Sequence, residues 1–570
     1  SVYYTQLHFV GKFRRSNMIT KNAFLTPTSL WEGFDDGLPL KEAEVNKIKV
    51  ENTVMTELYF SGRAIESERV RIYGFYSVPE SGRVKGALLY LSGENETIGF
   101  DSLKDFVAAG YAVLSVDLYG ERNQLKNHTE YPQSVSYANI ENCGRHKDFV
   151  DESAKETCWY EWVSVARYAV SFLKSKGYNK IGVIGDKTGA NVGWQLVAFD
   201  KRVDCFVSLF GAGWTAYKEE YKYADDAEPE RDESFKKYVA AVDAHAYAQY
   251  IKIPVLFLTS TNGEFMEFDR AGDTLSRIDK KVPCYYDFSV GYNAHLDEKS
   301  EKNVFSFLSG FLSEDGTKLP QNPELTVSEK NGKLCFNVTA DGSEKISAVK
   351  LAVNDGVIQS AYRTWKIYDM RKNENGEYEF GYTPLSERTF AFCRVEYENG
   401  TALSSKEACK RGGEIKQFVH RLVYSCENGL NGICFRDEKD GDGRAFLNRI
   451  IELKKGAFDI SGAYSPDGLI SYAFLENKFA LNDNSLIKFD VYAEEYAVIR
   501  LTLYELDING EIKEYSYAGE FKAEKLWQNS LVKITEFKSE VGITVKNYGG
   551  IIALGIKSES KFLINNVLVV

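Results

Sequence analysis

The chain of 570 residues is 44% hydrophobic and 27% charged, a composition typical of globular proteins with more than one core. Its net charge of -12 argues against a nucleic-acid partner, because phosphate binding needs a concentrated basic face. No apolar run approaches the roughly 18 residues that a membrane-spanning helix requires. We therefore expect about two to four domains, with no nucleic-acid and no membrane partner.

The cysteines and the start of the chain bear on the compartment. The nine cysteines are scattered without a CxxC or zinc-like spacing, which favours reduced thiols over a disulfide framework. The opening SVYYTQLHFVGKFRRSN has neither the apolar core nor the cleavage site of a signal peptide. We expect a cytoplasmic protein, and secretion is the alternative if a signal peptide has already been removed.

The first region alternates apolar runs with helical stretches. Strands are predicted at 84–93, 111–122, 180–185, 203–213, 253–261 and 283–289, and helices at 102–110, 159–177 and 301–314. This alternation is typical of a mostly parallel sheet with helices on both faces. We therefore expect one α/β domain over residues 1–315, with an N-terminal extension.

The pattern changes after about residue 320 to short alternating segments divided by Asn-Gly and Asp-Gly turns. Strands are predicted at 333–340, 348–354, 390–403, 485–493, 497–507, 551–558 and 562–570. Length and pattern predict an immunoglobulin-like β-sandwich over residues 320–410 and a jelly roll over residues 411–570. The closing FLINNVLVV resembles the last strand of carbohydrate-binding or galactose-binding-like modules.

A nucleophile-elbow pattern stands in the first region. Residues 181–194, IGVIGDKTGANVGW, read as an apolar strand that enters a turn and then a helix. Gly185 and Gly189 flank Lys187 in the order small-x-nucleophile-x-small. The pattern therefore predicts a strained strand–turn–helix elbow with a lysine at its tip.

Three further segments accompany the elbow. RIYGFYSVPESGRVKGALLYLSGENETIGFDSLKDFVAAGYAVLSVDLYGER precedes it, and IPVLFLTSTNGEFM and then YNAHLD follow it. With the elbow, they resemble acetyl xylan esterase and dienelactone-hydrolase-type α/β-hydrolases over about half the chain. The order elbow, acid turn, histidine is the chain order of that superfamily. The resemblance implies a doubly wound sheet and carboxylic-ester hydrolysis by a Ser-His-Asp triad.

Carried over residue by residue, the triad is altered. Lys187 stands at the nucleophile position, where the family has serine, and His295 keeps the base position. The family's catalytic aspartate falls on Gly263, and Glu264 beside it is the possible acid.

The predicted oxyanion region is altered too. Glu94 follows Gly93 in the first oxyanion loop, where the family usually has a neutral residue. Thr188, directly after the elbow, still offers a backbone N–H.

The chemistry of lysine argues against the usual esterase route. A lysine ammonium has no lone pair for attack, and making it neutral would require lowering its pKa by about 3 units. Carboxylates near the elbow would raise that pKa instead, and Glu94 and Glu264 are candidates for such neighbours. An acyl-lysine would also be an amide, so turnover would stall. We expect Lys187 to form an ion pair with Glu94 or Glu264 that fills the old site.

Two other nucleophiles are weaker alternatives. Asp186 could attack, as aspartate does in haloalkane dehalogenases, but it lies one residue early and Ile184 before it is not small. Thr188 could attack only if the elbow were shifted by one residue. A lone loop histidine such as His295 is more often structural than catalytic, although its place in the motif order favours the pocket.

Metal and sugar ligands are also considered. Asp437, Asp440 and Asp442 lie in a glycine-rich stretch that could hold structural calcium, although a solvated hairpin loop explains them better. The histidines show no metal-site spacing, and no cofactor is expected. Aromatic residues make up 14% of the chain and could stack on sugar rings. The C-terminal candidates are Tyr464, Tyr472, Tyr492, Tyr496, Tyr504 and Trp527.

These observations favour a pseudo-hydrolase that binds a carbohydrate or a partner, because the nucleophile and acid positions are both altered unfavourably. The alternative is an active hydrolase on a carbohydrate or small ester that uses an altered site around His295. A third hypothesis is a structural role in which the β domains mediate homo-oligomerisation.

Overall fold

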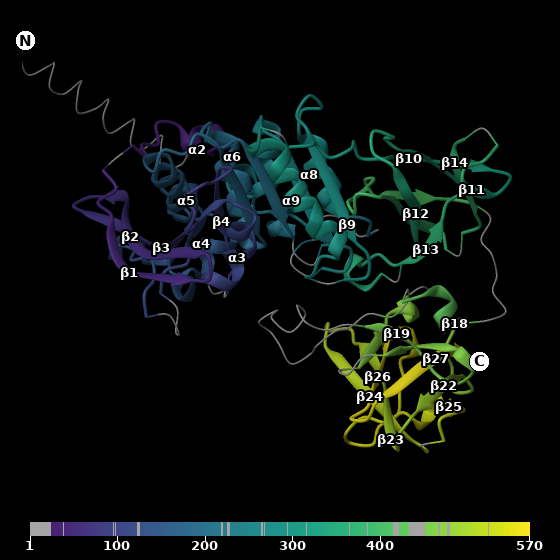
Figure 1. Cartoon of the computed structure of the whole chain (residues 1–570). Coiled ribbons are helices and arrows are strands. Elements are labelled where there is room, and N and C mark those ends of the chain that lie inside the picture. The colour runs from purple at the N-terminus through teal and green to yellow at the C-terminus, as the bar shows by residue number, and fades with distance from the viewer. Residues whose placement is uncertain are drawn as a thin grey trace, which may run out of the picture. The chain divides into compact units, whose positions relative to one another are not determined.

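The computed structural model (Figure 1) describes most of the chain from residue 24 to residue 570. Outside the described residues lie 1–23, 38, 95, 97, 122–125, 218–219, 225–228, 264–265, 267, 293, 315, 364, 375, 385, 414–420, 431–432, 434–450, 465–467, 476–478 and 523.

Nine strands of the described chain form one mixed sheet in the order β1-β2-β3-β5-β4-β6-β7-β8-β9. Their bounds are β1 Ala43–Val50, β2 Thr53–Ile65, β3 Glu68–Pro79, β4 Ala87–Leu91, β5 Ala112–Val116, β6 Ile181–Asp186, β7 Cys205–Leu209, β8 Val255–Ser260 and β9 Cys284–Ser289. Strands β5, β4, β6, β7 and β8 run parallel, whereas β1, β2 and β3 form an antiparallel edge. The predicted mostly parallel sheet is therefore confirmed, with an antiparallel extension.

Helices cover both faces of this sheet. Their bounds are α2 Pro27–Trp31, α3 Phe100–Ala108, α4 Gly144–Asp148, α5 Cys158–Ser175, α6 Thr188–Phe199, α7 Glu233–Ala241, α8 Phe268–Arg277 and α9 Glu298–Leu312. Phe206 of β7 lies against Gly193 of α6, where an added Cβ would come within 2.5 Å of the ring. Its neighbour Cys205 lies with Leu312 of α9 around Gly182 of β6. Because successive strand residues point to opposite faces, α6 and α9 lie on opposite sides of the sheet.

The rest of the chain is built from antiparallel strands. Their bounds are β10 Glu324–Lys330, β11 Lys333–Thr339, β12 Ile346–Asp355, β13 Lys366–Asp369, β14 Tyr378–Tyr382, β15 Arg388–Tyr397, β16 Ala402–Ser404, β17 Ala408–Arg411, β18 Arg421–Tyr424, β19 Glu452–Lys455, β20 Ser461–Tyr464, β21 Leu469–Ser471, β22 Leu486–Ala493, β23 Ala497–Leu506, β24 Ile512–Phe521, β25 Trp527–Lys533, β26 Ile551–Lys557 and β27 Phe562–Val569.

These strands form two pairs of sheets, and each pair shares an apolar core. The sheets β10-β11-β14 and β13-β12-β15-β16 enclose side chains such as Phe336, Leu351 and Val395. The sheets β19-β20-β27-β22-β25 and β21-β26-β23-β24 enclose a second core that includes Phe489 and Leu503. The predicted β character of this half is confirmed, while the immunoglobulin-like and jelly-roll assignments stay predictions.

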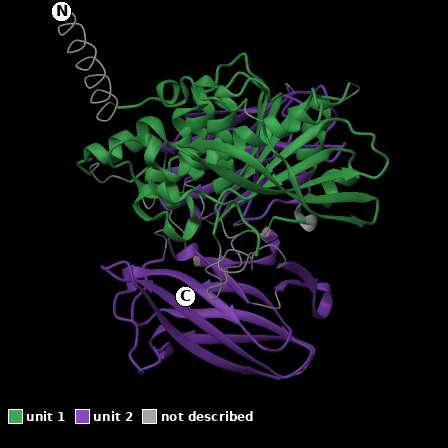
Figure 2. Cartoon of the chain, turned by 90° about the vertical axis from the view of Figure 1, so that its left-hand side faces the viewer, with its two compact units in different colours: residues 1–258, 265–285, 302–319 green, residues 259–264, 286–301, 320–570 purple. Residues whose placement is uncertain are grey.

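Contacts divide the chain into two compact units (Figure 2). Unit 1 comprises residues 1–258, 265–285 and 302–319. Unit 2 comprises residues 259–264, 286–301 and 320–570. The ends of β8 and β9, with the loops that follow them, therefore group with the antiparallel strands. The predicted division into three domains stays a prediction.

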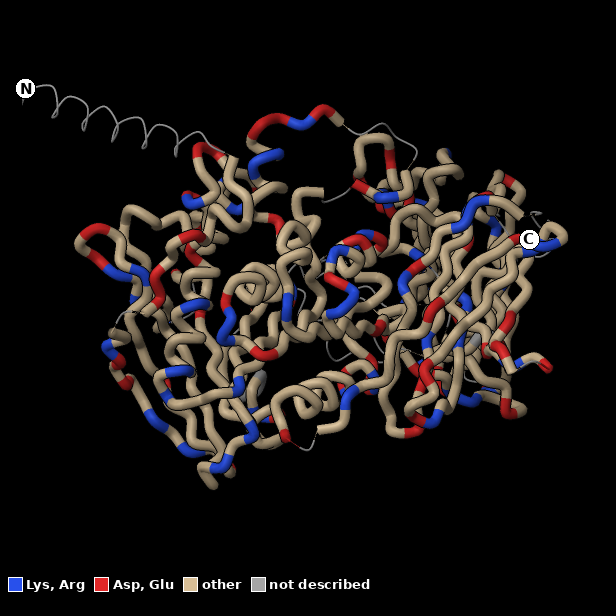
Figure 3. Tube along the Cα trace, turned by 90° about the horizontal axis from the view of Figure 1, so that it is seen from above, with Lys and Arg blue, Asp and Glu red and all other residues tan. Residues whose placement is uncertain are grey.

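Charge and thiol chemistry are spread over the molecule. Acidic and basic residues are interspersed along the trace (Figure 3). Each cysteine in the described part of the chain is a free thiol. None of the helices described has both the length and the apolar character needed to cross a bilayer.

Candidate functional site

The elbow turn places Lys187 between the end of β6 and the start of α6, at φ 50° and ψ -112°. A side chain rarely adopts this positive φ outside turns that the surrounding structure enforces. A Cβ at Gly189 would lie 2.1 Å from the carbonyl oxygen of Leu91, and one at Gly185 would lie 2.5 Å from that of Gly189. The turn is therefore packed so closely that glycine is required on both sides of the lysine.

The Lys187 ammonium forms an ion pair with Glu96. Its Nζ lies 2.5 Å from Glu96 Oε1, and the two side chains are 11% and 26% exposed. The other oxygen, Glu96 Oε2, accepts a hydrogen bond of 3.0 Å from the backbone N–H of Gly93. One carboxylate therefore bridges the elbow lysine and the predicted oxyanion loop.

The prediction that Lys187 forms an ion pair with Glu94 is wrong, because its ammonium pairs with Glu96. The alternative partner, Glu264, lies outside the described residues. Glu94 instead pairs with Lys147 of α4, with 2.5 Å between Lys147 Nζ and Glu94 Oε1. The hydroxyl of Thr188 donates to the same Glu94 oxygen at 3.1 Å. No motif distinguishes Glu96 from Glu94, which lies two residues earlier in the same loop. The backbone N–H of Glu96 donates to the Gly93 carbonyl at 3.4 Å.

The carboxyl groups of Asp186 and Glu96 set the pKa values at the elbow. Burial and the negative charge of Glu96 raise the pKa of Asp186 to about 7. Burial alone would lower the pKa of Lys187, but the charges of Asp186 and Glu96 outweigh it and raise that pKa above its ordinary value. Lys187 is therefore a cation at neutral pH, and Asp186 keeps its proton to a much higher pH than an ordinary aspartate does.

The loop with His295 belongs to unit 2 and is fixed at its far end by Asp297. His295 is half-buried, and its ring lies 5.4 Å from that of Tyr292 between centroids. Asp297 precedes α9 and accepts the backbone N–H groups of Lys299 and Ser300, each at 3.0 Å. This is the bonding of a helix N-cap, which ends the loop at a defined place.

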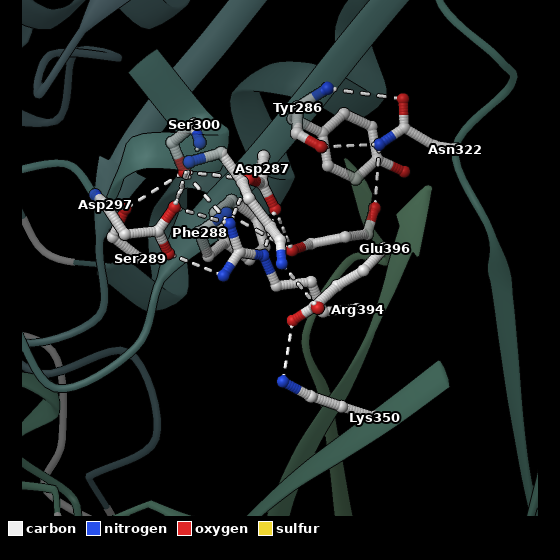
Figure 4. Close-up of polar contacts among 12 residues, drawn as sticks. Tyr286, Asp287, Phe288, Ser289, Asp297, Ser300, Asn322, Lys350, Arg394 and Glu396 are labelled. Carbon is white, nitrogen blue, oxygen red and sulfur yellow. Dashed lines mark hydrogen bonds and ion pairs between the residues drawn. The ribbon is translucent and has the colours of Figure 1, made fainter. Parts of the chain in front are cut away.

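Arg394 of β15 joins both ends of this loop (Figure 4). Its Nε and Nη2 donate to the two oxygens of Asp287 in β9 at 2.9 and 2.8 Å. Its Nη1 and Nη2 donate to the two oxygens of Asp297 at 2.5 and 2.9 Å. Burial raises the pKa of Asp287 in spite of Arg394, whereas hydrogen bonds from Arg394 outweigh burial at Asp297 and lower its pKa. The buried guanidinium therefore holds two carboxylates that flank His295 in the chain.

The predicted acid turn is anchored in the same unit. The side-chain amide of Asn262 donates to the carbonyls of Ala361 at 3.1 Å and Arg363 at 2.7 Å. Its backbone N–H donates to the Tyr292 carbonyl at 3.1 Å. Gly263 is buried and supplies no carboxylate at the position where the aspartate was aligned. This turn therefore connects segments of unit 2 through Asn262.

The predicted site residues thus fall into two groups. Gly93, Glu94, Asp186, Lys187 and Thr188 lie in unit 1, and the structure brings them together with Glu96. Gly263 and His295 lie in unit 2.

The metal-site prediction is considered next, for the residues that the structure describes. Among the described residues, no three His, Cys, Asp or Glu side chains are grouped as a metal site. The calcium candidates Asp437, Asp440 and Asp442 lie outside the described residues.

Among known proteins, the chain is similar to solved structures of esterases. No family model and no curated protein matches the chain. An acetyl xylan esterase from Paenibacillus sp. R4 aligns at 15% identity and TM-score 0.38, over 48% of this chain and 90% of the esterase. Acetyl xylan esterase 1 from Thermoanaerobacterium sp. JW/SL YS485 aligns at 17% identity and TM-score 0.37, over 48% and 88%. An esterase from Pyrococcus furiosus aligns at 15% identity and TM-score 0.30, over 51% and 98%. The chain is thus similar to esterases over about half of its length.

Proposed function

We propose that this chain is a pseudo-hydrolase: an α/β-hydrolase-like fold that has lost ester hydrolysis and acts by binding a carbohydrate. The observation that carries the proposal is the position of the Glu96 carboxylate. It contacts the ammonium of Lys187 at 2.5 Å and the N–H of Gly93 at 3.0 Å. The two groups that would meet a substrate carbonyl are therefore bound to each other through a side chain of the protein.

Acyl transfer needs a nucleophile with a free lone pair and unoccupied donors for the oxyanion. Lys187 is held as a cation by Asp186 and Glu96, which raise its pKa. The N–H of Gly93 already donates to a carboxylate. Removing a single oxyanion donor costs about a hundredfold to a thousandfold in kcat in enzymes that keep their nucleophile. Losing the nucleophile together with this donor leaves no route for the usual reaction.

Polar groups at the elbow suit a hydroxylated ligand. Glu94 and Glu96 are charged acceptors, while Lys147 and Thr188 are donors in the same cluster. Opposite charges are paired there, so hydrogen-bonding capacity is high while local charge is small. A neutral carbohydrate fits this chemistry better than a strongly ionic ligand does.

Hydrolysis of p-nitrophenyl acetate tests the proposal. The wild-type chain is expected to release p-nitrophenol no faster than its His295→Ala variant, at any pH between about 6 and 9. Both rates should match that of an unrelated protein at equal lysine content. Hydrolysis by the wild type that disappears in His295→Ala would show an active site and overturn the proposal.

The Lys187→Ser/Gly263→Asp variant shows how much of the old site survives. If only the nucleophile and the acid were lost, this variant should gain esterase activity. If the Glu96 carboxylate occupies the oxyanion loop, activity should appear only after Glu96→Ala is added. Activity in the double variant that Glu96→Ala does not increase would remove Glu96 from the explanation.

A further inference from the structure

The sheet β19-β20-β27-β22-β25 (Figure 1) has an outward face, turned away from its core, on which polar and aromatic residues alternate with buried ones along the strands. Along β22 every second residue is buried in the core, and Ile487, Phe489 and Val491 are at most 1% exposed. The alternate residues Lys488, Asp490 and Tyr492 are only partly buried, and the side chains of Lys488 and Asp490 are 21% and 18% exposed. Because side chains alternate between faces, these three form a row on the face turned away from the core.

The neighbouring strand β25 supplies a matching row. Its cross-strand partners pair Asp490 with Asn529 and Tyr492 with Trp527. Asp490 Oδ1 accepts from Lys488 at 2.7 Å and from Asn529 at 3.0 Å. Asp490 Oδ2 accepts from Asn566 of β27 at 2.9 Å. An ammonium and two amides therefore converge on one carboxylate that keeps part of its surface accessible.

An aromatic pair lies beside this polar cluster. The rings of Tyr492 and Trp527 are 5.8 Å apart between centroids and are inclined at 47°. A Cβ at Gly456 would come within 3.1 Å of both rings, and one at Gly462 within 2.7 Å of the indole. Glycine at these two places leaves room for the indole on the outer face, where Trp527 Nε1 donates to the Ala457 carbonyl at 3.2 Å.

A third aromatic ring projects from the adjoining loop. Phe458 follows Ala457 and is 83% exposed. Phe458 and Asp459 both adopt a positive φ of 59°. Two consecutive residues in this region cost free energy, and an exposed phenyl ring gains nothing from burial. The strained backbone and the exposed ring, next to the indole of Trp527, make Phe458 a candidate contact residue for a ligand.

We propose that this outer face is a binding site for a neutral polysaccharide, with Asp490, Asn529 and Asn566 as the hydroxyl-binding groups and Tyr492, Trp527 and Phe458 as the stacking groups. Lys488 neutralises Asp490, so the cluster does not favour a cation or a phosphate. Sugar rings have apolar C–H faces for aromatic rings and equatorial hydroxyls for amide and carboxylate groups. An elongated row along β22 suits a chain of sugars better than a single ring.

This site takes its ligand class from the proposed function but is separate from the elbow. If no polysaccharide bound to this face, the proposed loss of ester hydrolysis at the elbow would still stand, because ester hydrolysis tests it separately. Conversely, a hydrolytically active chain could still bind polysaccharide through β22 and β25.

Affinity electrophoresis of the full chain tests the site. The probes are soluble xylan, galactomannan and mixed-linkage β-glucan, each cast separately into native gels. At least one of them should retard the wild type, and Phe458→Ala and Asn529→Ala should each weaken that retardation about fivefold or more, equal to roughly 1 kcal/mol. Tyr492→Ala should weaken it further if its melting temperature shows that it folds.

Tyr496→Ala is the matched control, because Tyr496 is 53% exposed in the same unit but lies outside the row. It should migrate like the wild type in every gel. No retardation by any of the three polysaccharides would overturn the proposal. So would retardation that Phe458→Ala and Asn529→Ala leave unchanged, since both side chains are exposed and their loss should not unfold the protein.

Discussion

The charge state of Lys187 follows from its neighbours more than from its place on the elbow. A buried lysine without partners would lose its proton readily, because burial disfavours the charged form. Here Asp186 and Glu96 reverse that effect and raise the pKa of Lys187. Asp186 and the loop residue Glu96 together therefore keep the elbow lysine a cation.

Removing the charge of Glu96 should destabilise the protein. Glu96→Gln removes one of the carboxylate charges beside Lys187, whose side chain is only 11% exposed. We expect the free energy of unfolding to fall by roughly 1–3 kcal/mol in urea titrations.

The matched control is Glu80→Gln. Its partner Lys49 lies at the same 2.5 Å, but the two side chains are 58% and 47% exposed. Exposed ion pairs contribute about 0–1 kcal/mol, so this variant should stay near the wild type. Equal effects of the two substitutions would contradict the importance of burial at Lys187.

The Asp186 carboxyl predicts a pH dependence of stability. Its pKa is about 7 in the folded chain against an ordinary value of 3.8. The folded state keeps a proton that the unfolded state loses, so this carboxyl lowers stability progressively as pH rises from about 4 to about 7. Asp186→Asn removes that loss, so the melting temperature of the variant relative to wild type should rise across this window and then level off.

Taking the difference between two proteins at each pH cancels the other titrating groups. A difference that stays constant from about pH 4 to about pH 8 would show that Asp186 has an ordinary pKa. The expected amplitude is a few kcal/mol at most, at about 1.4 kcal/mol per pKa unit.

Among the elements, β15 has a role that goes beyond its own sheet. Arg394 in this strand holds Asp287 at the end of β9 and Asp297 at the start of α9. Asn262 after β8 is held by the carbonyls of Ala361 and Arg363. Both loops that the hydrolase resemblance assigns to the acid and the base are thus fixed by residues beyond 320.

Truncating Arg394 should be strongly destabilising. Arg394→Met leaves Asp287, which is fully buried, without its cation, and breaking such a buried pair costs about 3–5 kcal/mol. Lys345→Met in the same unit is the control, because Lys345 and Glu398 form an ion pair at 2.6 Å with 77% and 51% exposed side chains.

Adding Asp287→Asn to Arg394→Met should recover part of the lost stability, because it removes the buried negative charge that Arg394 balances in the wild type. Calorimetric melting of the four proteins measures these differences. An Arg394→Met melting temperature equal to that of Lys345→Met would contradict a stabilising role for the ion pairs of Arg394 with Asp287 and Asp297.

At the scale of the whole molecule, regular patterns were predictable and long-range pairings were not. The buried strands β4 to β9 follow from apolar runs, and the elbow follows from Gly185 and Gly189, which the packing requires. Strand β1 has no such signal, because it is exposed along nearly its whole length and shows no alternation.

The ion-pair partners of the predicted site residues could not be predicted from local sequence patterns. Nothing in LSGENE distinguishes Glu94 from Glu96 as the partner of Lys187, since the choice depends on how the loop folds back on Gly93. The pairing of Arg394 with Asp287 spans 107 residues of chain. A pattern confined to neighbouring residues contains no information on such contacts.

The most direct test of the claim that Lys187 is a cation and not a nucleophile is the titration of Lys187 itself. Competitive acetylation with a water-soluble N-hydroxysuccinimide ester, followed by peptide mass spectrometry, reports the pH at which each lysine becomes reactive. Lys252, with a side chain that is 68% exposed, serves as the reference. Because Asp186 and Glu96 raise the pKa of Lys187, its reactivity should rise only at a pH above the ordinary lysine pKa of 10.5. Preferential acetylation of Lys187 near neutral pH would show a neutral amine at the elbow and contradict the account.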